Sequence, residues 1–131
     1  MRSNRRRRPS GERGAVAVEF ALIVPVFVLM LVGLIEFSFA FNAQITINNA
    51  AREAARTMAI HNDVGKSTSA AVNAASTLNP ALSASQVSIS PGSCTPNATV
   101  KVTITYQLTP ITGFFGLQIP IRAVGAMLCG G

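Results

Sequence analysis

The sequence predicts an α+β fold, with one long N-terminal helix, a second short helix and a small antiparallel sheet of about three strands. Three observations support this prediction. Residues 15–35 are apolar except for Glu19, apolar residues then recur at three- and four-residue steps to about Ile60, and a period of two begins near Gln86. A chain of 131 residues allows one modest domain beside a membrane helix, but not two independent cores.

The apolar stretch predicts a transmembrane helix at residues 15–36. Its 21 residues from Ala15 to Ile35 reach about 30 Å as a helix, which is the thickness of a bilayer core. A cleaved secretory signal would have a shorter apolar region that ends in a small-residue cleavage site. Here the small-residue boundary, Gly14-Ala15, precedes the apolar region. Pro25 lies inside the span and lacks a backbone N–H, so a kink is expected there.

The positive charge belongs to the N-terminal segment. Residues 1–14 contain six arginines and one glutamate, whereas the rest of the chain has five basic and four acidic residues. A basic segment beside an apolar helix stays in the cytoplasm, so the C-terminal part is expected outside the membrane. A nucleic-acid-binding tail is the competing interpretation of the arginines. No aromatic or paired basic surface follows them, so no nucleic-acid partner is expected.

Beyond the span, the helical periodicity predicts that residues 37–60 continue the same helix outside the membrane. Glu36 is expected at the outer headgroup level, where the phenylalanines that follow it would form an interfacial belt or simply pack. Turn-forming residues at 61–65 end the helix, and an alanine-rich segment from Ser67 to Leu78 predicts a second one.

Residues 61–131 are expected to form a small extracytoplasmic α+β domain. The alternation predicts strands around residues 87–89, 100–106 and 119–125. Residues 110–116 are expected to form a loop anchored by Phe114 and Phe115. Cys94 and Cys129 lie outside the membrane in this topology, where a disulfide is permitted and would stabilise so small a domain.

Catalysis finds no support in the sequence. The soluble part has only three acidic residues and one histidine, with no aligned nucleophile and base, so neither an enzyme nor a cofactor is expected. Two cysteines and His61 supply too few ligands for a metal site. Gly65-Lys66-Ser67-Thr68 matches the end of a phosphate-binding loop, but Ile60 stands in place of its first glycine and no strand precedes it.

The N-terminal residues carry a family resemblance. Gly14 followed by AVAVEF, with Glu19 at the fifth position after it, resembles a type IV prepilin cleavage site. The wider string GAVAVEFALIVPVFVLMLVGLIEFSFAFNAQITINNAAREAAR is similar to the TadE-like family of minor pseudopilins in tight adherence (Flp) pilus systems. The resemblance covers Gly14 to about Arg56. The C-terminal part resembles the family only in its strand-rich plan and paired cysteines.

The resemblance implies that a prepilin peptidase removes residues 1–14 by cutting between Gly14 and Ala15 at the cytoplasmic face. It also implies that Glu19 pairs with the freed amine of a neighbouring subunit, and a charge in a bilayer does become tolerable when an opposite charge matches it. Glu19 in an ordinary single-span protein could instead face a partner helix or lie near the headgroups.

Two functions follow as hypotheses. The first is a non-catalytic minor pilin or pseudopilin of the cytoplasmic membrane, whose partners are the prepilin peptidase, other pilin subunits, the pilus secretion machinery and the lipid bilayer. The second is an unprocessed single-span membrane protein with an extracytoplasmic binding domain. The two differ in whether the arginines of residues 1–14 remain on the mature protein.

Overall fold

A computed structural model of the chain describes residues 11–113 and 116–130. Its elements in chain order are helix α1 (Gly11–His61), helix α2 (Val64–Ala74), the short 3-10 helix η1 (Ala84–Gln86) and strands β1 (Val87–Ser90), β2 (Thr99–Leu108) and β3 (Ile119–Leu128). The predicted α+β class is confirmed. The chain divides into two compact units, one up to Ile35 and one from Glu36 onward.

Helix α1 is continuous from Gly11 to His61 and passes through Pro25. The bend expected at Pro25 stays a prediction. The expected end near Ile60 agrees with the structure, since Asn62 takes a positive φ of 49° and interrupts the helical backbone. Its N–H still donates to the carbonyl of Met58, which satisfies one of the last free carbonyls of the helix.

Helix α2 begins earlier than the sequence pattern predicts, at Val64 instead of Ser67, and it ends at Ala74 instead of Leu78. The reason for the early start is Asp63, whose side chain accepts a hydrogen bond from the Lys66 backbone N–H at 3.0 Å. An acid in this N-cap position satisfies a free amide of the first turn. Lys66 and Ser67, which resembled the end of a phosphate-binding loop, therefore lie in the first turn of an ordinary capped helix.

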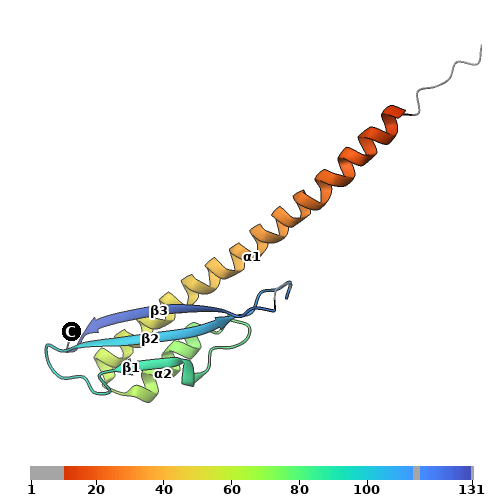
Figure 1. Cartoon of the computed structure of the whole chain (residues 1–131). Helices are drawn as coiled ribbons and strands as arrows, with labels where there is room; N and C mark the ends of the chain where they lie inside the picture. Colours follow the sequence, from red (N-terminus) through yellow and green to blue (C-terminus); the bar gives the residue numbers. More distant parts are fainter. Residues whose placement is uncertain (1–10, 114–115, 131) are drawn as a thin grey trace, which may run out of the picture. The chain divides into compact units, whose positions relative to one another are not determined.

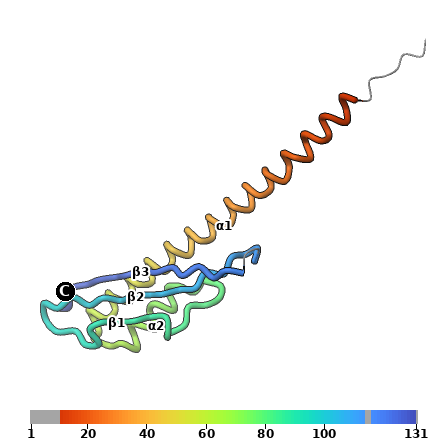
Figure 2. The backbone as a smooth tube through the Cα atoms, in the orientation of Figure 1, coloured from red at the N-terminus to blue at the C-terminus, as the bar shows by residue number. Residues whose placement is uncertain are grey.

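The three strands form one antiparallel sheet in the order β1-β2-β3 (Figure 1). Val87 pairs with Ile104 in the first ladder, and Thr99 pairs with Leu128 at one end of the second. Figure 2 shows that the β2–β3 connection lies at the end of the sheet opposite to the β1–β2 connection. The third strand is longer than the predicted 119–125 because its pairing with β2 continues to Leu128.

The core of the C-terminal unit joins one face of the sheet to α2 and to the second half of α1. The α1 side chains in it are mostly alanines, from Ala43 to Ala59, with Ile47 and Met58 as the large members. From the sheet they meet inward-facing residues of alternate positions, namely Val100, Val102, Ile104, Tyr106 and Ala123. Residues 43–59 of α1 thus share a hydrophobic core with the expected domain at 61–131.

Small side chains allow α1 and β3 to approach each other closely. A Cβ atom added to Gly125 would lie 2.2 Å from the carbonyl oxygen of Ala51 and 2.7 Å from the backbone nitrogen of Arg52. Both obstacles are backbone atoms, which cannot rotate away. Gly125 is therefore required by packing, since only a residue without a side chain lets this strand lie against the helix.

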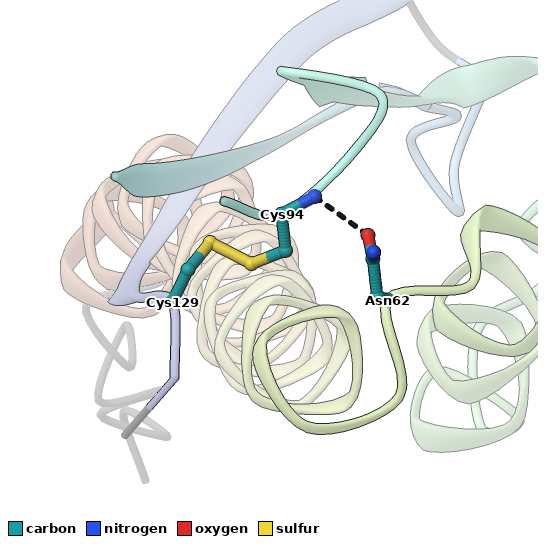
Figure 3. Close-up of a disulfide and its surroundings, with 3 residues drawn as sticks. All are labelled: Asn62, Cys94 and Cys129. Carbon is teal, nitrogen blue, oxygen red and sulfur yellow. Dashed lines mark hydrogen bonds between the residues drawn. A yellow bond between two sulfur atoms is a disulfide. The ribbon is translucent and has the colours of Figure 1, made fainter. Parts of the chain in front are cut away.

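A disulfide joins the end of the sheet to the loop that precedes β2. Cys94 and Cys129 are bonded, with their Cα atoms 5.6 Å apart (Figure 3). Asn62, directly after α1, accepts a hydrogen bond from the backbone N–H of Cys94 at 2.6 Å. The disulfide closes a loop with a sequence separation of 35, which corresponds to about 3–4 kcal/mol of stabilisation in the chain-entropy treatment.

Candidate membrane and assembly site

The first half of α1 exposes nearly all of its apolar side chains within the described chain. Fourteen large apolar residues between Val16 and Ile35 are exposed: Val16, Val18, Phe20, Leu22, Ile23, Val24, Val26, Phe27, Val28, Leu29, Met30, Leu31, Leu34 and Ile35. Burial of each such side chain is worth about 1.5–3 kcal/mol relative to exposure. An apolar surface of this size requires lipid or other helices around it.

This half of α1 is long and apolar enough to cross a membrane. A core helix of a soluble protein can be as long and as apolar, but it is mostly buried, whereas the side chains of this half of α1 are exposed. The fold and this helix together define the class of protein. It is a small α+β domain whose first helix, α1, has an apolar N-terminal half that is suited to membrane anchoring.

Three predicted site residues lie near the start of this helix. Gly14, Ala15 and Glu19 are all helical and exposed. A Cβ atom added to Gly14 would meet nothing within 4 Å, so packing gives no reason for glycine at that position. Glu19 lies one turn after Ala15, and no hydrogen bond or ion pair of its side chain occurs within residues 11–113 and 116–130.

A second site was not foreseen from the sequence and lies at Glu36, the first charged residue after the apolar half of α1. The Glu36 carboxylate accepts two backbone hydrogen bonds, from the Ile111 N–H at 3.1 Å and from the Thr112 N–H at 2.7 Å. Hydrogen bonds to an ionised acceptor are stronger than those between neutral groups. Glu36 therefore holds the loop between β2 and β3 against α1, in addition to ending the uncharged stretch as expected.

The local sequence shapes this loop for the contact. Pro110 and Gly113 close a turn through a hydrogen bond from the Gly113 N–H to the Pro110 carbonyl at 3.3 Å. Gly113 has a φ of 56°, a left-handed conformation that glycine adopts without strain. Ile111 and Thr112 lie at the tip of the turn, where their amides reach Glu36. The expected anchors Phe114 and Phe115 lie outside the described residues.

The remaining polar residues that drew interest in the sequence have structural roles. Ser67 is fully buried, and its hydroxyl donates to the carbonyl of Ala54 at 2.7 Å, which joins α2 to α1. The His61 Nδ1 lies 3.2 Å from the Thr57 carbonyl, one turn back on α1. Asp63 caps α2 as described. The position of Ser67 on the alanine-rich face of a short helix indicates that its side chain is buried. No pattern in the sequence indicates that its partner is the carbonyl of Ala54.

Comparison with known families supports the resemblance. Residues 14–56 match the model of a family described as TadE-like protein. This is the segment, from Gly14 to about Arg56, on which the sequence resemblance rested, so that prediction is confirmed. No curated protein and no solved structure gives a match.

The match supports a role associated with tight adherence pili, because TadE-like proteins are structural proteins of that system. It includes the predicted cleavage position, Glu19 and the whole apolar half of α1. It also includes most of residues 43–59, the packed half of α1 that contacts the sheet. The sheet and α2 lie outside the matched segment.

Proposed function

We propose that this protein is a membrane-anchored minor pilin or pseudopilin that takes part in assembling a tight adherence (Flp) pilus. Its anchor would be the apolar half of α1 in the cytoplasmic membrane, with residues 1–14 on the cytoplasmic side and the α+β domain outside. The observation that carries the proposal is the coincidence of three features in one helix. These are a family match that begins at Gly14, an exposed apolar stretch at residues 15–35, and Glu19 as the one acid within that stretch.

The first step of the proposed function is processing by a prepilin peptidase between Gly14 and Ala15. Cleavage would remove six arginines and leave a free amine on Ala15, four residues before Glu19. Gly14 and Ala15 are both exposed, and no other part of the described chain packs around Gly14, which supports access by a peptidase.

The second step is assembly with neighbouring pilin subunits. An ionised carboxylate inside a bilayer costs at least about 2.5–3.5 kcal/mol, so Glu19 needs an opposite charge there. The amine freed on another subunit would supply that charge, and the apolar surface of one helix would cover that of the next. The protein would thus act by contact alone, with the prepilin peptidase, other pilin subunits and the secretion machinery as partners.

Processing is tested by determining the N-terminal residue of the protein recovered from membranes of cells that contain a prepilin peptidase. We expect Ala15 for the natural sequence and an intact basic segment for Gly14→Ala. Gly11→Ala is the matched control, because it makes the same change three residues away and should leave cleavage intact. Recovery of the whole N-terminal segment from the natural chain, despite an active peptidase, would instead support an unprocessed single-span protein with an extracytoplasmic binding domain.

Assembly is tested with Glu19→Gln, which keeps the shape of the side chain and removes its charge. We expect the variant to be cleaved and inserted normally, but to lose most of its co-purification with other pilin subunits. Glu53→Gln, an exposed change in the packed half of α1, serves as the control for loss of one acid. Unchanged co-purification of the Glu19 variant would show that charge pairing at this position is not needed.

A further inference from the structure

The contact made by Glu36 determines how far one loop of the domain lies from the outer end of the proposed span. Glu36 is the first charged residue after Glu19, and it follows Ala15 by 21 residues. That separation is about 32 Å along an α-helix, or just over the thickness of a bilayer core. Ile111 and Thr112 donate their amides to Glu36. In the proposed topology their backbone would therefore lie at the level of the outer headgroups.

The side chains at this level suit a lipid interface. Ile111 is 57% exposed, and Phe37, next to Glu36 on the helix, is 69% exposed. Leu117, which follows in the same β2–β3 connection, is 64% exposed. The sequence has no charged residue from Val102 to Ile121, so the loop brings no charge that would have to be desolvated at the membrane.

We propose that the turn at Pro110–Gly113 rests on the outer leaflet of the bilayer, with the Ile111 side chain inserted among the lipids and Glu36 holding the turn in place. The inference rests on the proposed membrane anchoring, and adds a second membrane contact to it. Lipid is the occupant that the position favours, because the turn is fixed beside the residue where the chain leaves the bilayer. Lipid surrounds that point in every copy before any assembly with other subunits.

This contact would restrain the domain at the membrane surface. A single helix leaves the domain attached at one point, whereas a second contact beside the helix fixes which side of the domain faces the lipid. The β1–β2 connection, which contains Cys94 of the disulfide (Figure 3), lies at the opposite end of the sheet from the β2–β3 connection (Figure 2). With the β2–β3 turn on the lipid, the disulfide would be the more distant of the two from the bilayer.

The test uses tryptophan fluorescence of the full chain in phosphatidylcholine vesicles, because the natural sequence contains no tryptophan. Ile111→Trp reports on the turn, and Ser93→Trp, an exposed position in the β1–β2 connection, is the matched control at the other end of the sheet. Phe27→Trp reports on the span. Each variant is exposed to brominated lipid, which quenches from within the bilayer, and to iodide, which quenches from water.

We expect brominated lipid to quench Ile111→Trp and Phe27→Trp severalfold more than Ser93→Trp, and iodide to show the reverse order. Adding Glu36→Ala to Ile111→Trp should release the turn and reduce its quenching by lipid. Circular dichroism spectra should confirm that this double variant keeps its helices and strands.

Three results would overturn the inference. If iodide quenches Ile111→Trp as strongly as Ser93→Trp while lipid quenches Phe27→Trp, the turn lies in water although the anchor stands. If lipid does not quench Phe27→Trp, the membrane anchoring itself fails, and the turn contact fails with it. If Ile111→Trp is shielded from both quenchers until the protein is diluted in lipid, the turn packs against a second copy of the chain.

Discussion

The two halves of helix α1 share one continuous backbone but differ in their side chains. In residues 16–35 the apolar residues are large, such as Phe, Leu, Ile and Val, and they are exposed. In residues 43–59 the buried residues are mostly alanines, with Ile47 and Met58 among them. Large side chains all around a helix suit a surrounding of lipid or other helices, whereas small ones on a single face suit close contact with a sheet. Both halves are helical, so the difference between them lies in the size of their apolar side chains and not in their secondary structure.

The largest expected effect comes from making the same substitution in each half. Ile47→Ala should lower the free energy of unfolding of the domain by about 2–5 kcal/mol, because Ile47 is completely buried in its core. Ile23→Ala, at an exposed position of the apolar half, should change it by less than about 0.5 kcal/mol. Denaturant unfolding in mild detergent can be followed by the fluorescence of Tyr106, which is buried and is the only tyrosine of the chain.

If the two isoleucine substitutions lowered the free energy of unfolding equally, the division of α1 into a packed half and an unpacked half would be contradicted. A loss from Ile23→Ala alone would show that the first half of the helix, and not the second, supports the domain.

A somewhat smaller effect is expected where α1 and β3 approach most closely. Gly125→Ala should destabilise the domain by about 3 kcal/mol, because the new methyl group would overlap backbone atoms of Ala51 and Arg52. Gly92→Ala is the control, since a Cβ atom there would meet nothing within 4 Å. The same unfolding measurement applies. If both glycine variants were equally stable, the helix and the strand would have to lie farther apart than the structure places them.

The smallest effect is expected where α2 contacts the packed half. Ser67→Ala should cost about 1 kcal/mol, because it removes one buried hydrogen bond to the Ala54 carbonyl, an oxygen within the body of α1. Ser69→Ala, at an exposed position of the same helix, should leave the unfolding midpoint unchanged. If Ser69→Ala lowered the free energy of unfolding more than Ser67→Ala does, the face of α2 that contains Ser67 would not be the face that packs against α1.

Much of the fold followed from the sequence because its signals are local and periodic. The span, the continuation of the helix to about residue 60 and all three strands appear as runs with periods of 3.6 or 2. Ends of elements were less well predicted. Helix α2 starts at Val64 because of the cap at Asp63, and β3 ends at Leu128 because β2 offers partners that far.

The candidate site divides in the same way. Gly14, Ala15, Glu19 and Pro25 were named from their spacing along one helix, where sequence distance gives position directly. The bonds of Glu36 to Ile111 and Thr112 join residues 75 and 76 positions apart, and no periodicity predicts such a pair.

The sequence by itself therefore determined where the chain is apolar, where it is helical and where it alternates, since these properties depend on near neighbours. It also determined the family resemblance over Gly14 to Arg56, which depends on a contiguous motif. Only the tertiary structure decided that Gly125 must be a glycine, that Ser67 bonds to α1 and that Glu36 holds the β2–β3 turn. Each of these contacts joins distant parts of the chain, and their geometry exists only after the helix and the sheet have packed.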